Sequence, residues 1–455
     1  MNLEVWVEQV NGPVGILERF DDKTLRFTYS AAAVASGNAS CRISMALPVR
    51  EEAYSDAACV AFFSNLLFEG RGLDGVVDTH GLDRDDYGQL LYHLGADCPG
   101  AISVMPEGAG PGKRPGLFPQ DYVKLSQAEI TAMVRSLHFD GRLPADSPDP
   151  SPVAGVQPKL ALVFRDGSFF LPKEGSGAPS THILKVSPHG DARLTRHEVA
   201  LLSVAADIGL DVTEAERHIF HDERRGVDIE TILSTRFDRI FEDGKITRLH
   251  SEDFCQALGL PRRLKYEREA TNEERRFSAA AVGKLSAQVA APAQFRLRFF
   301  QQTLFNLAVG NTDNHAKNSS IIYRGAAGEL APLYDVVPAT MDDQHTHAFA
   351  FDLGRASFAE DLTKEDLLVA MSDIGFAKPR LAGPWIKLLK QVAVPGIAAL
   401  AERGDKQLAD GIAAQLEVVS RALEVDLAIP ERDYFPRAQR DEKRQGNRGG
   451  WGGWS

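Results

Sequence analysis

Residues 310–318 read Gly310-Asn311-Thr312-Asp313-Asn314-His315-Ala316-Lys317-Asn318, the densest cluster of unusual polar residues in the chain. It follows an apolar helical pattern over residues 295–309 and precedes a strand-like run over residues 319–323. So many small and ionisable residues between two buried elements pack poorly but suit a functional site. Asp313 and Asn318 have four residues between them, which lets one loop present a carboxylate and an amide oxygen together.

A second carboxylate follows this loop. A glycine-rich turn at residues 325–328 leads to another strand-like run over residues 330–334, which ends at Asp335. A hairpin of that length brings Asp335 back to the loop. We therefore predict that Asp313 accepts a proton from a substrate hydroxyl, while Asn318 and Asp335 ligate Mg²⁺ against nucleotide phosphates. Protein kinases use the same Asp-x4-Asn spacing.

Phosphoryl transfer also needs a cation and a backbone cradle for the phosphates. Lys185 lies in an otherwise apolar strand pattern over residues 182–186, and Glu198 on the following helix is its candidate partner. A lysine on an edge strand is the alternative interpretation. For the cradle, Gly155 within residues 154–159 permits close backbone approach, although the chain has no GxGxxG pattern.

The order of the predicted elements indicates an α+β fold. Short alternating runs in the first forty residues predict a small antiparallel β unit, and a helix over residues 82–94 follows, capped by Asp83 or Asp85. Helical patterns dominate from residue 278 onward. We expect an N-terminal subdomain over residues 1–110, a linker over 111–150, a nucleotide-binding β-rich lobe over 151–260, a helical catalytic lobe over 261–430 and a disordered tail over 431–455.

Composition narrows the class of protein. The chain has 455 residues and no apolar run of about 18 residues, so we expect no membrane span. Its first residues lack the pattern of a secretory signal, and a cytoplasmic location is expected. The four cysteines form no CxxC pair, which argues against a zinc ribbon or a disulfide scaffold. A net charge of −12 disfavours direct nucleic-acid binding.

A glycine-rich segment at residues 108–113 has some features of a nucleotide loop. A P-loop needs Gly and Ser or Thr where this chain has Glu107 and Arg114. We therefore interpret the segment as a linker.

Two further polar clusters have simple interpretations. His345-Thr346-His347 has no third positioned metal ligand, so we interpret it as a polar loop. A basic stretch is interpreted as a solvated face, with a nucleic-acid contact as the alternative. It consists of Arg262, Arg263, Lys265 and Arg268.

Six segments resemble, in order, the signatures of the HipA family, which are serine/threonine kinase toxins of bacterial toxin–antitoxin modules. They are residues 153–159 (Val-Ala-Gly-Val-Gln-Pro-Lys), 181–185 (Thr-His-Ile-Leu-Lys), 236–239 (Arg-Phe-Asp-Arg), 252–259 (Glu-Asp-Phe-Cys-Gln-Ala-Leu-Gly), 310–318 and 333–335 (Leu-Tyr-Asp). Residues 62–70 and 103–108 resemble the N-terminal subdomain of that family, so the resemblance covers about residues 1–430. It implies a two-lobed protein-kinase-like fold with a small N-terminal β/α subdomain and a mostly helical C-terminal lobe.

The resemblance also assigns site residues by position. It makes Asp313 the catalytic aspartate, and Asn318 and Asp335 the ligands of Mg²⁺. The residues that it places around ATP are Ala154, Gly155, Val156, Gln157, Pro158, Lys159, Lys185, Thr235, Arg236, Phe237, His315, Ala316, Lys317, Asn318, Tyr334 and Asp335. Family members commonly have Glu before Arg-Phe-Asp, where this chain has Thr235.

By resemblance, the chain is expected to be an ATP- and Mg²⁺-dependent serine/threonine protein kinase. It would arrest growth by phosphorylating a translation component, by analogy an aminoacyl-tRNA synthetase. The implied partner is a helix-turn-helix antitoxin similar to HipB, with DNA bound only through that antitoxin. Two other functions stay open: a co-repressor role with the antitoxin, and phosphotransfer to a small molecule.

One position departs from the family pattern. Members typically present a serine two residues before the Ala-Gly of the cradle, and its autophosphorylation switches the kinase off. This chain has Pro152 there, and a proline biases the preceding residue, Ser151, towards an extended backbone. We expect self-inactivation to be absent or moved to Ser151, with Ser147 as a lesser candidate. The alternative is a stiff linker, with inhibition by the antitoxin alone.

Overall fold

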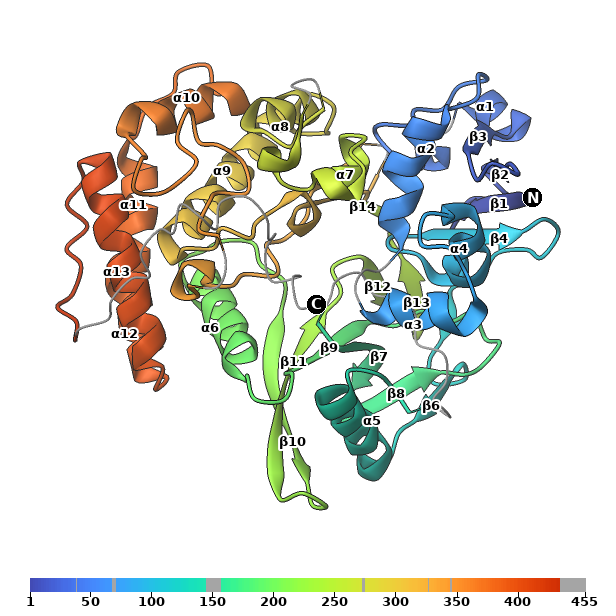
Figure 1. Ribbon diagram of the computed structural model, residues 1–455, viewed down its shortest axis with the longest axis horizontal. Coiled ribbons are helices and arrows are strands. Elements are labelled where there is room, and N and C mark those ends of the chain that lie inside the picture. Colours follow the sequence, from blue (N-terminus) through green and yellow to red (C-terminus); the bar gives the residue numbers. More distant parts are fainter. Residues whose placement is uncertain are drawn as a thin grey trace. The chain divides into compact units, whose positions relative to one another are not determined.

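The computed structural model describes residues 1–37, 39–67, 71–144, 157–271, 275–325, 327–343 and 346–433. Expectations for Ser147 and Ser151, for residues 154–156, for His345 and for the tail from residue 434 therefore lie outside the described residues. The chain forms two compact units (Figure 1). The first comprises Met1–Thr195, Ala215–Arg262 and Ile321–Gly328, and the second comprises Arg196–Glu214, Arg263–Ser320 and Glu329–Ser455.

The first unit begins with a four-stranded antiparallel sheet in the order β3-β2-β1-β4. Its strands are β1 (Asn2–Val7), β2 (Gly15–Arg19), β3 (Leu25–Tyr29) and β4 (Ile102–Pro106). Alternate residues of β1 are buried, as the alternating sequence pattern requires. The helices of this part are α1 (Ala31–Ser36), α2 (Asp56–Phe63), α3 (Arg71–His80) and α4 (Tyr87–Leu94).

The N-terminus of α4 differs from our prediction. Asp86, rather than Asp83 or Asp85, caps the helix, and its carboxylate accepts a hydrogen bond from the Gln89 N–H at 3.1 Å. The reason is a preceding turn in which the Asp83 carboxylate binds the Asp85 N–H at 2.9 Å. That turn delays the helix start to Tyr87.

A six-stranded sheet forms the second part of this unit, in the order β10-β11-β9-β7-β8-β6. Its strands are β6 (Tyr122–Lys124), β7 (Lys159–Arg165), β8 (Ser168–Pro172), β9 (His182–Val186), β10 (Ala215–Asp222) and β11 (Val227–Thr235). The turn between β7 and β8 has positive φ at Asp166 (49°) and Gly167 (68°). This geometry matches the twist of the paired strands and is the one expected of an Asp-Gly turn in a hairpin.

Residues 111–144 hold more structure than the linker we expected. They form β5 (Gly116–Leu117), β6 and α5 (Gln127–Asp140), a helix opened by a capping box at Ser126 and Glu129. One side of α5 buries Ile130, Val134 and Leu137 against Leu160 and Leu184 of the sheet. Helix α5 thus completes the core of the six-stranded sheet, to which β6 belongs, whereas β5 pairs with β13 (Lys245–Arg248) in a separate three-stranded sheet.

A buried carboxylate joins three distant segments of the first unit. Glu252 on β14 (Ser251–Asp253) accepts hydrogen bonds from the Ser44 hydroxyl at 2.6 Å, from the Met45 N–H at 2.9 Å and from the Tyr323 hydroxyl. Burial raises the pKa of Glu252 to about 7, although these hydrogen bonds and the charge of Arg42 oppose the shift. The other elements here are β12 (Arg239–Glu242), β13 (Lys245–Arg248) and α7 (Phe254–Ala257).

The second unit is mostly helical and is organised around α9 (Pro292–Val309), which Figure 1 shows among the other helices. Much of α9 is buried, including Phe300, Leu304 and Phe305, because α8, α11 and α13 all contact it. The helices of this unit are α6 (Arg193–Asp207, from Arg196), α8 (Ala279–Ser286), α10 (Lys364–Ile374), α11 (Gly383–Gln391), α12 (Ile397–Glu402) and α13 (Lys406–Leu423). Among the described residues, none of the helices has the length and apolar character needed to cross a bilayer.

Candidate active site

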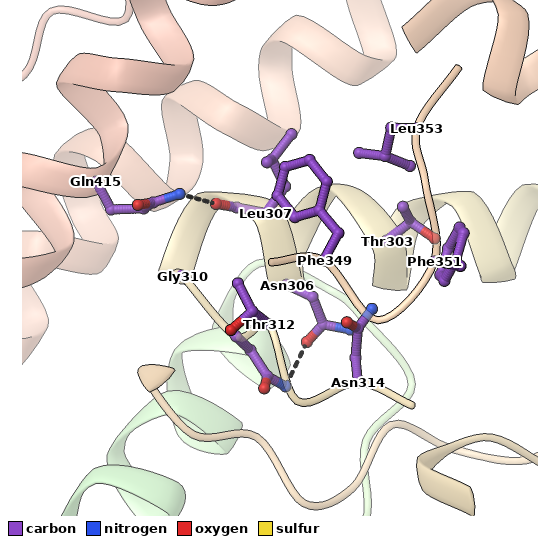
Figure 2. A pocket seen from close by; sticks show the side chains of 11 residues that line it. Thr303, Asn306, Leu307, Gly310, Thr312, Asn314, Phe349, Phe351, Leu353 and Gln415 are labelled. Carbon is purple, nitrogen blue, oxygen red and sulfur yellow. Dashed lines mark hydrogen bonds between the residues drawn. The ribbon is translucent and has the colours of Figure 1, made fainter. Parts of the chain in front are cut away.

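The candidate site starts where α9 ends. Gly310 stops the helix in the left-handed conformation, with φ of 70°, and a Cβ there would lie 2.0 Å from the Thr340 Oγ1. The loop then folds back on the helix, because the Asn311 amide donates to the Asn306 Oδ1 at 3.0 Å (Figure 2). The Asp313 N–H in turn donates to the Asn311 Oδ1 at 3.2 Å. Hydrogen bonds of the Asn306 and Asn311 side chains therefore fix the backbone that leads to Asp313.

Asp313 and Asn318 are tied together by the main chain of the loop. The Asn318 Nδ2 donates to the Asp313 main-chain oxygen at 2.9 Å, and the His315 N–H donates to the same oxygen at 2.8 Å. The 3-10 helix η6 (Ala316–Asn318) closes the loop. Because the amide nitrogen of Asn318 is engaged, its Oδ1 is left as an acceptor, which is the atom a hard cation requires.

Tyr334 brings the next segment to this loop. Its hydroxyl donates to the Lys317 main-chain oxygen at 2.9 Å and lies 2.7 Å from the Ser320 hydroxyl. Asp335 follows with φ of 57°, a left-handed conformation that is uncommon outside glycine. Strand β16 (Glu329–Leu330) is shorter than the run that we predicted, so side-chain hydrogen bonds rather than a long hairpin hold Tyr334.

Electrostatics at Asp313 reflect its burial. Its side chain is only 8% exposed, and burial raises its pKa above the ordinary value, as does the charge of Asp335. A hydrogen bond from Tyr266 and the positive charges of Lys265 and Arg268 act in the opposite direction. The pKa of His315 is lowered well below its ordinary value, mainly by burial, so this imidazole is neutral at pH 7.

The neighbours of Asp313 from residues 265–268 were missed by sequence reasoning. The Tyr266 hydroxyl donates to the Asp313 Oδ1, and the Arg268 guanidinium lies 3.8 Å from the centre of the Tyr266 ring. Lys265 and Arg268 therefore face the candidate site, and our interpretation of them as a solvated face is wrong. No local pattern could reveal this contact, because 47 residues separate Tyr266 from Asp313.

The first unit carries the predicted phosphate-binding lysines. Lys185 lies on β9 between β11 and β7, so the alternative of an edge-strand lysine is wrong. Lys159 is directly opposite Lys185 in the register of β7 and β9. Both point away from the face that packs on α5, because Leu160 and Leu184 belong to that core. The strand register thus places Lys159 and Lys185 on the same face of the sheet.

Other predicted nucleotide contacts border the same sheet. The Gln157 amide donates to the Val186 main-chain oxygen at 3.4 Å, and the Val186 N–H donates to the Pro158 oxygen at 2.8 Å. Thr235 ends β11, followed by Arg236 and Phe237.

The Arg236 guanidinium is bound to the Asp238 carboxylate at 2.9 Å, and its N–H donates to the Thr181 main-chain oxygen at 2.9 Å, so its contact with a nucleotide stays a prediction. Glu198 is buried on α6. Because it belongs to the second unit and Lys185 to the first, their pairing stays a prediction.

A pocket lies behind the loop in the second unit (Figure 2). It contains about 310 Å³ of empty space, part of it open to solvent. The residues that line it are Thr303, Asn306, Leu307, Gly310, Asn311, Thr312, Asn314, Phe349, Phe351, Leu353 and Gln415. Sequence analysis did not predict this pocket.

The oxygen donors at the loop fit Mg²⁺. Asn318 and Asp335 would supply an amide oxygen and a carboxylate, the hard ligands that Mg²⁺ prefers, with phosphates completing the shell. Within the described ranges, no group of three or more His, Cys, Asp and Glu side chains is arranged to hold a metal ion. The His347 imidazole instead contacts the Asp342 main-chain oxygen at 2.8 Å.

Comparisons with known proteins identify the relatives of this chain. The putative kinase Y4mE of Sinorhizobium fredii is 33% identical over 73% of this chain and 77% of its own length. The serine/threonine-protein kinase toxin HipA of Shewanella oneidensis is 28% identical over 73% of this chain and 75% of its own length. The fold of this chain and its similarity to these two proteins, both named as kinases, place it in the class of kinases.

Matches to family models identify the family within this class of kinases. Residues 151–393 match the HipA-like C-terminal domain, and residues 3–105 match the HipA N-terminal domain. The chain belongs to the HipA family. A chain of the Shewanella oneidensis HipA, HipB and operator DNA complex has the same fold, with a TM-score of 0.73 and 24% identity over 92% of this chain and 97% of that chain. These matches confirm the resemblance and the predicted α+β, kinase-like fold.

Proposed function

We propose that this chain is an ATP- and Mg²⁺-dependent serine/threonine protein kinase and the toxin of a toxin–antitoxin module. The observation that carries the proposal is the closure of the 310–318 loop by Asn318 together with the Tyr334 contact to Lys317. These contacts bring a buried carboxylate and two oxygen donors to one place in the second unit. Membership of the HipA family supports the toxin role.

Each group has a separate part in the transfer. The Asp313 carboxylate accepts the proton of a serine or threonine hydroxyl, and the hydroxyl oxygen forms a bond to the γ-phosphorus as the bond to ADP breaks. Mg²⁺, when bound, neutralises charge on the nucleotide phosphates. Asn318 and Asp335 would hold it, and Lys159 and Lys185 would bind phosphate oxygens of ATP.

Resemblance to the family also guides the choice of substrate and partner. We propose that a translation component, an aminoacyl-tRNA synthetase by analogy, is phosphorylated and that growth stops as a result. A helix-turn-helix antitoxin similar to HipB is the proposed partner, and the relative solved with HipB and operator DNA supports this choice. The net charge of −12 favours DNA contact through that antitoxin rather than by this chain alone.

Labelling with [γ-³²P]ATP and Mg²⁺ in a cell extract tests the kinase proposal. We expect label on serine or threonine of protein, and no label above background with Asp313→Asn. Label found only in a small molecule would favour the alternative phosphotransferase and contradict the proposal. The same variant distinguishes the co-repressor role from the kinase role. Operator binding with the antitoxin would survive Asp313→Asn, whereas labelling would be lost.

A further inference from the structure

Tyr266 makes several contacts within the candidate site of the second unit. The residue is 2% exposed, and its hydroxyl donates a hydrogen bond to the Asp313 Oδ1. Its ring contacts the Arg268 guanidinium at 3.8 Å, the Lys265 ammonium at 5.5 Å and, edge-on, the His315 ring at 5.0 Å. The tyrosine therefore touches both a catalytic candidate and a predicted ATP contact.

The segment that carries Tyr266 is fixed on both sides. The Ala316 N–H donates to the Lys265 main-chain oxygen at 3.0 Å, which ties the segment to the catalytic loop. On the other side, the Glu267 N–H donates to the Ala350 oxygen at 2.8 Å. The Arg268 Nη1 donates to the Phe349 oxygen at 3.3 Å. The backbone thus leaves the tyrosine ring little freedom, and the place of its hydroxyl is determined by the fold.

The hydrogen bond distinguishes the two oxygens of Asp313. The Tyr266 hydroxyl holds Oδ1, which leaves Oδ2 for the substrate hydroxyl. A carboxylate without such a donor can rotate about its terminal torsion, which has a broad energy minimum. Lys265 and Arg268 are close enough to act on Asp313 electrostatically. If the carboxylate rotated away from Tyr266, these cations would attract it and compete with the substrate hydroxyl.

We propose that Tyr266 is a positioning residue for phosphoryl transfer, whose hydroxyl fixes Oδ1 of Asp313 so that Oδ2 faces the substrate hydroxyl. The inference rests on the proposed function, in which Asp313 accepts the substrate proton. A neutral donor suits this task, because a cation paired directly with the carboxylate would reduce its ability to accept a proton. The aromatic ring adds rigidity through its contacts with Arg268 and His315.

The test is Tyr266→Phe, which removes the hydroxyl and keeps the ring with its contacts. We expect kcat to fall roughly 10- to 100-fold, the range for a misplaced reacting group, while KM for ATP changes less than about twofold. Tyr122→Phe is the matched control, because it removes a buried hydroxyl that donates to the Pro179 oxygen at 2.9 Å in the first unit. The control should retain the wild-type kcat.

Rates are expressed per ATP-binding site counted by titration, so a variant that folds incompletely still reports the rate of its folded fraction. A second variant, Asp313→Asn with Tyr266→Phe, should be no slower than Asp313→Asn alone, because Tyr266 acts through Asp313. An additive loss would overturn the proposal, as would a wild-type kcat in Tyr266→Phe. If Asp313→Asn itself were fully active, the proposed function would fail instead, and the two failures are thus distinguishable.

Discussion

The side-chain amide of Asn318 donates a hydrogen bond to the main-chain oxygen of Asp313 over 2.9 Å. This contact closes the loop and turns the amide so that its oxygen is available to a cation. The proposed proton acceptor and one proposed metal ligand are thus parts of one small hydrogen-bonded ring, and substitution at either residue has a separate expected effect.

Replacement of Asp313 by Asn should remove the proton acceptor while its shape is kept. We expect phosphoryl transfer to fall roughly 10²-fold or more, because general base catalysis contributes about that much. ATP binding should largely survive, since Asp313 is not a proposed ligand of the nucleotide. Single-turnover kinetics and an ATP titration check both parts, and a wild-type transfer rate would show that Asp313 has another role.

Removal of either proposed Mg²⁺ ligand should weaken nucleotide binding only when Mg²⁺ is present. Asn318→Ala and Asp335→Ala each delete one oxygen donor, so we expect the affinity for ATP to lose most of its dependence on Mg²⁺. Calorimetric titrations with and without Mg²⁺ measure this difference. Asp373→Ala, at an exposed position of α10, is the control. Wild-type behaviour of both ligand variants would contradict the proposed metal site.

Glu252 should make the stability of the first unit depend on pH. Its pKa is about 7 in the folded chain against an ordinary value of 4.5, so the folded state binds the proton more tightly than the unfolded state. The free energy of unfolding should therefore be highest below pH 4.5 and fall by about 3 kcal/mol as the pH rises to 7.

Glu252→Gln cannot ionise, and its stability relative to wild type should rise over the same interval. Denaturant unfolding at pH 5 and pH 7.5 measures this, with Glu51→Gln at an exposed position as the control. A constant difference between wild type and Glu252→Gln at both pH values would be evidence against the shifted pKa.

Operator DNA should be bound tightly only in the presence of a more basic antitoxin. The chain carries a net charge of −12, and the affinity of proteins for phosphates depends on the number of cations that contact them. Fluorescence anisotropy with labelled operator DNA at physiological salt tests the chain alone and with its antitoxin. Tight binding by the chain alone would disprove this view.

Autophosphorylation should be absent or moved to Ser151, because Pro152 has no hydroxyl at the position where family members typically have the serine. Mass spectrometry after incubation with Mg²⁺ and ATP locates the modification. Phosphate on Ser151, lost together with self-inhibition in Ser151→Ala, would support relocation. An unmodified 146–158 peptide from an active enzyme would support the alternative of a stiff linker.

The sequence alone determined the parts of this protein that depend on near neighbours. The polar loop at residues 310–318 was recognisable because small and ionisable residues interrupt two apolar patterns, and spacing alone related Asp313 to Asn318. The hairpin at Asp166 and Gly167 was predictable because its turn chemistry acts over a few residues. These features need no knowledge of the remaining core.

Only the tertiary structure decided which distant residues meet. Tyr266 contacts Asp313 across 47 residues, and Ser44 contacts Glu252 across 208. Lys159 lies opposite Lys185 because three strands pair in one particular register, and α5 belongs to the sheet although its segment resembled a linker. The physical reason is that propensity and periodicity act over a few residues, whereas contacts of this kind are fixed by the packing of a whole core.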